Sequence, residues 1–346
     1  MNNPTASRAA TFLAMGAALL TGSLALPGLA YAQAVQLENC GRTLSFDKPP
    51  SRVVSIGQGT HEILLSLGLG KSIVGTATWL APLPADLAEE GNALPRLADN
   101  TPSFEAVLGT RPDLVMVQWI NDIAPDSGRV GTFEQFAEFG IPVYVSPAEC
   151  AKSDFDAGSG DGARSFSWSM DLLEQEITEI AEIFGAQEAG TTLIDNNRSR
   201  VEEARARVAG VNASDVSVLY WFSSPELGGE AYVAGQLGAP GWISEALGLT
   251  NVIDSNEEWP LVGWESLASL DPKVIVLGTM DRRNLPADDV AEKRRFLETD
   301  PVASRMSAVT GGRLIELDAQ SMNPTLRAVD GVEVIANSLQ SLGLAD

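Results

Sequence analysis

Two stretches of the chain repeat the same order of apolar and polar positions. Residues 104–118 and 264–278 each begin with an aromatic residue and a glutamate, continue with a short helical run, reach a proline seven residues after the glutamate, and end in an apolar run. Proline stops a helix and favours an extended chain, and a wholly apolar strand is typical of a sheet covered on both faces. The pattern therefore predicts two similar α/β halves.

Apolar spacing predicts further elements around each copy. In the first half we expect strands at 52–56, 72–76, 114–117 and 142–145, and helices at 61–67 (capped by Thr60) and 133–139. In the second half we expect strands at 216–220 and 314–317, and helices at 242–249, 291–297 and 326–342. Residues 80–96 contain several prolines and are interpreted as a connection. Residues 167–209 are helical with a break at Gly185, so they can join the halves as a stiff strut.

The predicted fold class is therefore α/β, with two lobes that each hold a mainly parallel sheet flanked by helices. We expect the first lobe at residues 33–165, a helical segment at 166–210 and the second lobe at 211–346. Residues 153–162 combine acids with glycines, but they lack the ligand spacing and closing glutamate of a calcium loop. A surface loop is the simpler interpretation.

Residues 1–32 are predicted to be a secretory signal peptide. They contain Arg8, an apolar run at residues 11–26 and a small-residue cleavage site that ends at Ala32. A retained membrane anchor is the alternative, and the cleavage site together with Gly22 and Pro27 argues against it. We therefore expect an exported, periplasmic and soluble protein.

The sequence has two cysteines, Cys40 and Cys150. In an oxidising compartment an even pair usually forms one disulfide, which here would tie the mature N-terminus to the first lobe. Lipid attachment at Cys40 is the rival interpretation, but residues 37–39 (Leu-Glu-Asn) are too large and polar for a lipoprotein cleavage site.

The charge of the chain excludes some partners. There are 23 Lys and Arg against 46 Asp and Glu, a formal net charge of -23. Removing residues 1–32 takes away one arginine and no acid, which gives -24 (-23 minus 1). Such a surface repels nucleic acid and anionic membranes, so we expect neither as a partner.

His61 is the one histidine in the sequence. Metal sites built from protein groups usually combine several His, Cys or carboxylate ligands, and a Ser-His-Asp triad would need a nucleophile elbow that the sequence lacks. We therefore predict a protein that is not an enzyme, has no permanently bound cofactor and does not ligate a metal directly. His61 itself is either a first-turn helix residue or a residue lining a cleft.

Ligands of open α/β sheets bind beyond the carboxyl ends of the strands. Tryptophan at these positions offers a flat stacking surface and arginine offers forked hydrogen bonds to anions, although core packing is the alternative for each tryptophan. The predicted ligand-binding residues at these ends are Gln58, His61, Trp79, Trp119, Trp221, Arg282 and Arg283.

Glu105 and Glu265 occupy matching positions in the two copies of the repeat. Each is a favourable acid in the first turn of its helix, which alone could explain it. Paired surface carboxylates, one on each lobe, could also meet two basic sites on a symmetric partner.

Several short runs, taken in order and spacing, resemble one known family. They are residues 52–56, 60–64, 67–69, 111–115, 247–252 and 271–276, together with Glu105 and Glu265. This arrangement resembles the periplasmic binding proteins of ABC importers for iron-siderophores, haem and cobalamin, over essentially the whole mature chain. The resemblance implies two lobes joined by a single long helix at residues 186–209, with the ligand between the lobes. It also implies that Glu105 and Glu265 dock onto arginines of a dimeric ABC permease in the inner membrane.

The resemblance implies a monomeric binding protein that captures a metal chelate, which we predict to be a ferric siderophore. Cobalamin or another corrinoid is one alternative, and haem, with His61 or Tyr232 as its ligand, is another. A sensor subunit or an extracytoplasmic enzyme on the same scaffold are further alternatives.

Overall fold

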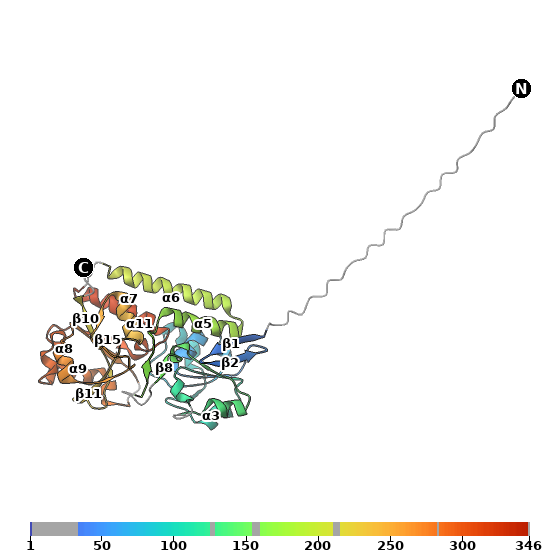
Figure 1. The fold of residues 1–346 in the computed structure, drawn as a ribbon, viewed down its shortest axis with the longest axis horizontal. Coiled ribbons are helices and arrows are strands. Elements are labelled where there is room, and N and C mark those ends of the chain that lie inside the picture. The colour runs from blue at the N-terminus through green and yellow to red at the C-terminus, as the bar shows by residue number, and fades with distance from the viewer. Residues whose placement is uncertain (2–33, 125–128, 154–159, 210–214, 282–283, 345–346) are drawn as a thin grey trace. The chain divides into compact units, whose positions relative to one another are not determined.

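The first half of the chain is coloured blue to green in Figure 1. It forms a five-stranded parallel sheet in the order β5-β4-β3-β6-β7. The computed structural model describes residue 1 and residues 34–124, 129–153, 160–209, 215–281 and 284–344. The strands of this sheet are β3 (Val53–Ile56), β4 (Ile73–Ala77), β5 (Arg96–Ala98), β6 (Leu114–Val117) and β7 (Val143–Val145).

The second sheet is mixed. Its order is β13-β11-β10-β14-β15, with β12 also paired to β10. Strand β10 is parallel to β12 and β14, and β14 is parallel to β15, whereas β11 is antiparallel to both β10 and β13. The strands are β10 (Ser217–Ser223), β11 (Glu230–Val233), β12 (Thr250–Asn251), β13 (Leu261–Gly263), β14 (Val274–Thr279) and β15 (Leu314–Asp318).

Helices cover both sheets. Those of the first half are α1 (Gln58–Ser66), α2 (Ala85–Asn92), α3 (Phe104–Gly109) and α4 (Phe133–Glu138). Those of the second half are α7 (Ala239–Leu247), α8 (Trp264–Leu270), α9 (Val290–Thr299), α10 (Ser307–Thr310) and α11 (Arg327–Ser341). Between the halves lie α5 (Met170–Phe184) and α6 (Gln187–Arg207), separated by Gly185 at φ 70°.

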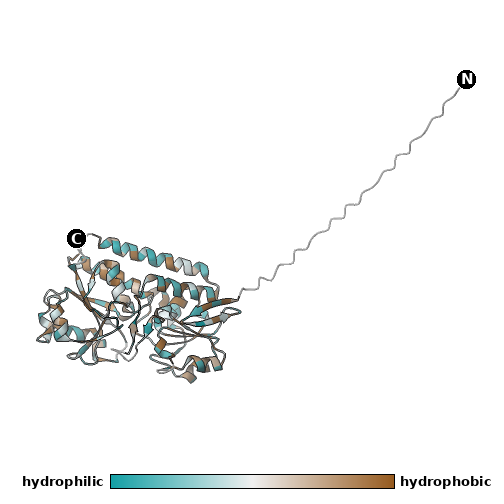
Figure 2. Cartoon of the chain, viewed as in Figure 1, coloured by the Kyte–Doolittle hydropathy of each residue, from teal (hydrophilic) through white to brown (hydrophobic). Residues whose placement is uncertain are grey.

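Helix α6 connects the lobes. Its 21 residues pack against α5, α7 and α11, and most of its surface is hydrophilic (Figure 2). Its buried residues, Gly190, Asn197, Val201 and Ala204, lie three to seven positions apart, so they share one narrow face. This is the helical strut that the sequence predicted.

Alternation along the strands divides the interior into separate cores. In β10, Val218 and Tyr220 face the core shared with α5, α7 and α11, whereas Leu219 and Trp221 face a second core with α8 and α9. The outer face of the first sheet packs against α3 and α4 in a third core. The strands are therefore covered on both faces, as their apolar sequences indicated.

An N-terminal hairpin of β1 (Val35–Asn39) and β2 (Arg42–Phe46) is fastened to the first lobe. Cys40 and Cys150 form a disulfide with a Cα–Cα distance of 4.9 Å. Asn39 adds two hydrogen bonds to the backbone of Val145, both 2.8 Å. The predicted disulfide is confirmed, whereas the predicted signal peptide falls almost entirely outside the described residues.

The predicted fold class is confirmed, with corrections to individual elements. Helix α1 begins at Gln58 with Gly57 as its N-cap, so Thr60 does not cap it; Thr60 Oγ1 instead donates to the carbonyl of Gly57 (2.9 Å). The supposed connection at residues 80–96 contains α2, and residues 96–98 form β5. Strands β11 and β13 were not predicted.

The lobe boundaries remain predictions, and most of the 153–162 loop lies outside the described residues. In the part of the chain that the structure describes, no helix is long and apolar enough to cross a membrane.

Candidate functional site

The carboxyl ends of strands from both sheets meet at a junction between the lobes. The backbone N–H of Asp281, after β14, donates to the carbonyl of Leu80, after β4 (2.9 Å). Gln118, after β6, accepts hydrogen bonds from the backbone N–H of Gly59 (2.8 Å) and from Nε2 of Gln320 (3.5 Å). Because ligands of open α/β sheets bind beyond such strand ends, this junction is the candidate site.

A buried ion pair fastens the lobes beside this junction. Arg327, at the start of α11, contacts Glu62 of α1 (Nη2 to Oε1, 2.7 Å) and Asp318 at the end of β15 (Nη1 to Oδ2, 2.9 Å). It also donates to the carbonyl of Pro82. The Glu62 and Arg327 side chains are only 1% and 7% exposed, so their attraction is little screened by solvent.

Gln58 is fully buried and uses its whole side-chain amide within the protein. Its Oε1 accepts from the backbone N–H groups of Leu80 (3.0 Å) and Ala81 (3.1 Å). Its Nε2 donates to Glu62 and to the carbonyl of Ala81, both 2.9 Å. Gln58 therefore fixes the chain that leaves β4, and the structure shows it holding the wall of the site.

His61, Trp79 and Arg96 form a stack. The rings of His61 and Trp79 lie 4.3 Å apart, and the Arg96 guanidinium lies 4.1 Å from the Trp79 ring centroid. His61 is fully buried, and neither ring nitrogen has a hydrogen-bond partner among the described residues. Burial, assisted by the charges of Arg96 and Arg327, lowers the pKa of His61 to about 3. His61 is therefore a neutral residue enclosed beneath Trp79.

One pocket at the junction has a volume of about 530 Å³. It is lined by the segment after β4, including Trp79 and Leu80, by Arg96 and Asp99, and from the other lobe by Asp281. Arg96 also contacts Asp99 (2.8 Å), and its side chain remains 44% exposed. The stack on Trp79 thus positions a guanidinium group at the edge of the pocket.

A second pocket, of about 310 Å³, is formed mainly by the second lobe. Three aromatic residues line it: Phe222 at the end of β10, Tyr232 on β11, and Trp259. The rings of Phe222 and Trp259 lie 4.5 Å apart. We call this the aromatic pocket. Its flat, largely apolar walls suit stacking against a conjugated or apolar ligand surface.

A small apolar cluster brings Phe222 together with residues of the first lobe. Leu80, Met280 and Ala319 are its buried members, and Trp119 and Phe222 pack against them half-buried. Trp119 therefore lies at the junction, and its role in ligand binding stays a prediction.

Asp122 is a buried carboxylate shortly after Trp119. It is 3% exposed, and its Oδ2 has no hydrogen-bond partner among the described residues. Burial raises its pKa to about 7, and the nearby acids Glu149 and Asp161 contribute in the same direction against Arg129. Across the described residues, no group of three or more His, Cys, Asp and Glu side chains could hold a metal ion.

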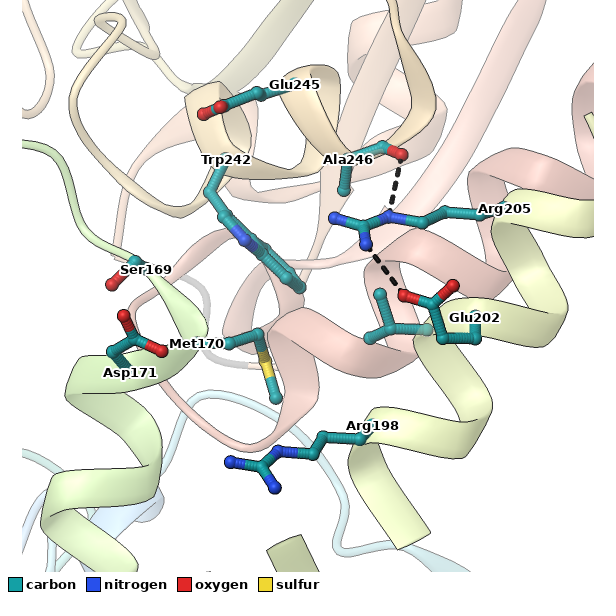
Figure 3. Close-up of a pocket in the computed structure, with 10 residues that line it drawn as sticks. Ser169, Met170, Asp171, Arg198, Glu202, Arg205, Trp242, Glu245 and Ala246 are labelled. Atoms are coloured by element: carbon teal, nitrogen blue, oxygen red, sulfur yellow. Dashed lines mark hydrogen bonds and ion pairs between the residues drawn. The ribbon is translucent and has the colours of Figure 1, made fainter. Parts of the chain in front are cut away.

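A further pocket of about 300 Å³ lies among helices instead of strand ends (Figure 3). Met170 of α5, Arg198 and Arg205 of α6, and Trp242 of α7 are among its lining residues. Arg205 donates to Glu202 (2.8 Å) and to the carbonyl of Ala246 (3.1 Å), and Arg198 pairs with Glu174 (2.6 Å). Its arginines are thus already engaged, and we do not take it as the ligand site.

Residues 53–321 match the model of a family described as periplasmic binding protein. This match covers most of the chain and both sheets. The chain belongs to the periplasmic binding protein family.

Relatives of this periplasmic binding protein include a curated "Cobalamin-binding protein" of Halobacterium salinarum, 23% identical over 303 residues, which cover 86% of this chain and 72% of the relative. A solved structure titled as an ABC-type Fe3+-hydroxamate transport system, from Saccharomonospora viridis, superposes with a TM-score of 0.71 at 24% identity, over 88% of this chain and 98% of that one. A periplasmic haem-binding protein from Pseudomonas aeruginosa superposes with a TM-score of 0.64 at 21% identity, over 86% and 94%. At these identities the structural likeness supports the fold alone.

The structure brings only part of the predicted ligand set to the pockets of this binding protein. Trp79 lines the first pocket and Trp119 lies at the junction. Trp221 is fully buried in the second core, where its Nε1 donates to the carbonyl of Ser223 (3.0 Å) and to Ser224 Oγ (2.9 Å). Its position is that of a packing residue. Arg282 and Arg283 lie outside the described residues.

Other pocket residues of the binding protein were missed from sequence. Arg96 and Trp259 lie on segments whose positions depend on β5 and the loop before β13, which apolar spacing did not predict. Tyr232, on the unpredicted strand β11, was named only as an alternative haem ligand. Phe222 was not in the predicted ligand set. The alternation of side chains along β10 could have favoured it, because Trp221 shares a face with Leu219.

Glu105 and Glu265 are exposed in the first turns of α3 and α8. Ser103 caps α3 by accepting from the backbone N–H of Ala106 (3.2 Å), whereas α8 begins after Gly263. The two carboxylates are therefore available to a partner of the binding protein, one on each lobe.

Proposed function

We propose that this protein is the extracytoplasmic substrate-binding component of an ABC importer, and that its cargo is a metal chelate of the ferric-siderophore class. The observation that carries the proposal is the aromatic pocket at the junction of the strand ends. Phe222 and Trp259 supply stacked aromatic walls, and Tyr232 adds a phenol. Such walls recognise the organic envelope of a chelate by contact area, with a few polar groups fixing its orientation.

Three observations outside the pocket support this proposal. The chain belongs to a family of periplasmic binding proteins. The names of relatives and structural neighbours refer to cobalamin, ferric hydroxamate and haem, each a metal held by an organic ligand. The Cys40–Cys150 disulfide is typical of an oxidising compartment such as the periplasm.

A siderophore fits the observed residues better than haem does. Haem needs an axial ligand from the protein, and His61 is fully buried beneath Trp79. Among the three aromatic residues that line the aromatic pocket, Tyr232 carries an oxygen that can bind haem iron. Haem binding through Tyr232 is therefore the second candidate. If it is correct, the native protein keeps the visible absorbance of haem after desalting, and the Tyr232→Phe protein loses it.

Tryptophan fluorescence tests the cargo proposal, because Trp119 and Trp259 lie at the junction and in the aromatic pocket. We expect quenching by ferric desferrioxamine B or ferric enterobactin, and none by hemin or cyanocobalamin at equal concentration. The metal-free siderophores control for non-specific quenching. Binding of hemin or cyanocobalamin alone would replace the siderophore by that ligand class. No change and no thermal shift with any of the four compounds would overturn the proposal.

We further propose that Glu105 and Glu265 dock onto basic residues of the importer's two membrane subunits. Both carboxylates are exposed, and both stand in the first turn of the helix that precedes the repeated strand. Two like charges at equivalent positions suit a partner with twofold symmetry, and charge complementarity of this kind governs the rate and register of association.

The docking proposal is tested by uptake, with the binding protein carrying Glu105→Lys and Glu265→Lys together. We expect transport to be lost while affinity for the cargo is unchanged. A matched control carries Glu138→Lys and Glu298→Lys, which reverse two other exposed acids, one on each half, and alter the net charge equally. Equal transport by the two double variants would contradict the docking role.

A further inference from the structure

Lys293 is a buried lysine that the proposed function does not yet use. It lies on α9 and is fully buried. Its Nζ donates to the carbonyls of Phe222 (2.5 Å), Gly278 (2.6 Å) and Trp221 (3.4 Å). An ammonium group is costly to bury unless hydrogen bonds replace its water, so these carbonyls explain why the lysine is tolerated there.

The three carbonyls belong to the carboxyl ends of two neighbouring strands. Trp221 and Phe222 end β10, and Gly278 lies near the end of β14, which runs parallel to it. The two backbones come close together at this point, because a Cβ added to Gly278 would lie 2.9 Å from the carbonyl oxygen of Phe222. Lys293 therefore holds together the two strand ends that lead into the junction.

Phe222 occupies an irregular position in its strand. Trp221 pairs with Val233 and Ser223 pairs with Tyr232, so the antiparallel register shifts across Phe222. Such a bulge leaves the extra residue outside the regular ladder and re-aims its side chain. The carbonyl of Phe222 consequently takes its hydrogen bond from Lys293.

The re-aimed side chain is the one that enters the aromatic pocket. The Phe222 ring contacts Trp259 at 4.5 Å and lines the pocket with Tyr232. On the other side of the bulge, Ser223 Oγ donates to Asp288 (2.6 Å). The backbone around Phe222 is therefore held on one side by Lys293 of α9 and on the other by Asp288, which lies just before α9.

We propose that Lys293 is a positioning residue of the ligand site: its ammonium group fixes the bulged backbone at Phe222 and thereby sets where the Phe222 ring stands in the aromatic pocket. In this proposal Lys293 acts through the backbone of Phe222. The consequence for cargo affinity rests on the proposed function, whereas the consequence for the ring position does not.

The ring position is measured without any ligand. A 4-trifluoromethylphenylalanine placed at position 222 reports its surroundings by 19F NMR, because the neighbouring Trp259 ring shifts its resonance. We expect Lys293→Met, which keeps the length of the side chain but removes its N–H donors, to displace or split this resonance. The control Leu297→Val removes apolar volume from the same helix, away from the carbonyls, and is expected to leave the resonance in place.

Two results of the NMR experiment would overturn the proposal. One is an unchanged resonance in folded Lys293→Met protein. The other is the same displacement in Leu297→Val, which would mean that any loosening of α9 moves the ring. If Lys293→Met does not fold, Lys293→Gln replaces it; this side chain keeps two donors for three carbonyls, so we expect a second resonance, and a single native resonance would overturn the proposal.

The affinity experiment uses ferric desferrioxamine B, ferric enterobactin, hemin and cyanocobalamin as probes. For whichever probe the native protein binds, we expect Lys293→Met to bind on the order of tenfold more weakly, as for loss of a charged hydrogen-bond donor, and Leu297→Val to bind with native affinity. Equal affinities of the two variants would overturn the role in the ligand site. Failure of all four probes with the native protein would count against the proposed function, and the NMR result would still decide the role of Lys293.

Discussion

The side chains at the strand ends of the two sheets differ in what they contact. In the first sheet, the polar and aromatic groups after β3 and β4 turn inward: Gln58 is fully hydrogen-bonded and His61 is stacked beneath Trp79. In the second sheet, Phe222 and Tyr232 line an aromatic pocket. The first sheet is wholly parallel, whereas the second carries antiparallel β11 beside β10. Two similar halves therefore have different roles: the first supports the junction, and the second shapes the aromatic pocket.

We expect the greatest loss of stability from breaking the ion pair that fastens the two lobes. Arg327→Leu leaves Glu62 buried without its cation, and removal of one partner of a buried pair costs about 3–5 kcal/mol. Chemical denaturation measures the loss. The control is Arg294→Leu, whose ion pair with Glu316 is exposed and is expected to contribute about 0–1 kcal/mol. Similar losses in both variants would remove the distinction between a supporting junction and ordinary surface.

The buried aspartates that follow β6 and β14 differ in their hydrogen bonding. Asp288 accepts from Ser223 Oγ and from the backbone N–H groups of Asn284 (2.7 Å) and Leu285 (2.9 Å). Asp122 has an Oδ2 without a partner among the described residues, and burial raises its pKa to about 7. The carboxylate of Asp288 accepts hydrogen bonds from its neighbours, whereas burial destabilises the charged form of Asp122.

The pH dependence of stability separates these aspartates. Because the folded pKa of Asp122 is raised, the folded state keeps a proton that the unfolded state has released between about pH 4 and 7, so stability falls as pH rises through this window. Asp122→Asn is therefore expected to gain roughly 2–4 kcal/mol relative to the native protein between pH 4 and pH 8. Asp288→Asn is expected to lose about 1–3 kcal/mol, because one amide oxygen can still accept from the two backbone N–H groups but the amide nitrogen cannot accept from Ser223 Oγ. Urea unfolding at both pH values measures the differences; an Asp122→Asn profile parallel to the native one would contradict this account.

Two aromatic substitutions are expected to have smaller effects, one mainly on binding affinity and the other mainly on stability. Phe222→Leu removes an aromatic wall and is expected to weaken binding of the proposed cargo by about 1–2 kcal/mol while leaving the melting temperature nearly native. Trp79→Leu disrupts the stack between Arg96 and His61, so we expect it to lower stability and to alter affinity less than Phe222→Leu does. Fluorescence titration and thermal unfolding of both variants measure this contrast. The reverse assignment of effects would place the main cargo contact on the first lobe.

Apolar spacing predicted the parts of the fold whose burial is regular. Strand β6 begins and ends where its apolar run does, and Gly185 separates α5 from α6 in the left-handed conformation that glycine favours. The repeated stretch correctly indicated two α/β halves. By contrast, β11 (Glu-Ala-Tyr-Val) is short and has a charged first residue, and nothing local showed that it would pair beside β10.

The candidate site was predicted less well because its residues are selected by tertiary packing. Trp221 and Phe222 are neighbours of similar chemistry, yet strand alternation buries the first and leaves the second at the pocket. Gln58 and His61 lie at a strand end, as predicted, but partners more than 15 residues away in sequence enclose them. Local patterns locate the rim of a sheet; they do not show which rim residues other segments will cover.

The bulge at Phe222 also bears on how such a protein can change over evolutionary time. A bulge is a place where one strand already holds an extra residue, so the surrounding ladder tolerates a change of chain length there better than elsewhere. A one-residue deletion or insertion at position 222 would present a different side chain to the cavity while the cores on either side of β10 keep their residues. Descendants of this protein therefore have a short route to a new cargo that does not require a new fold.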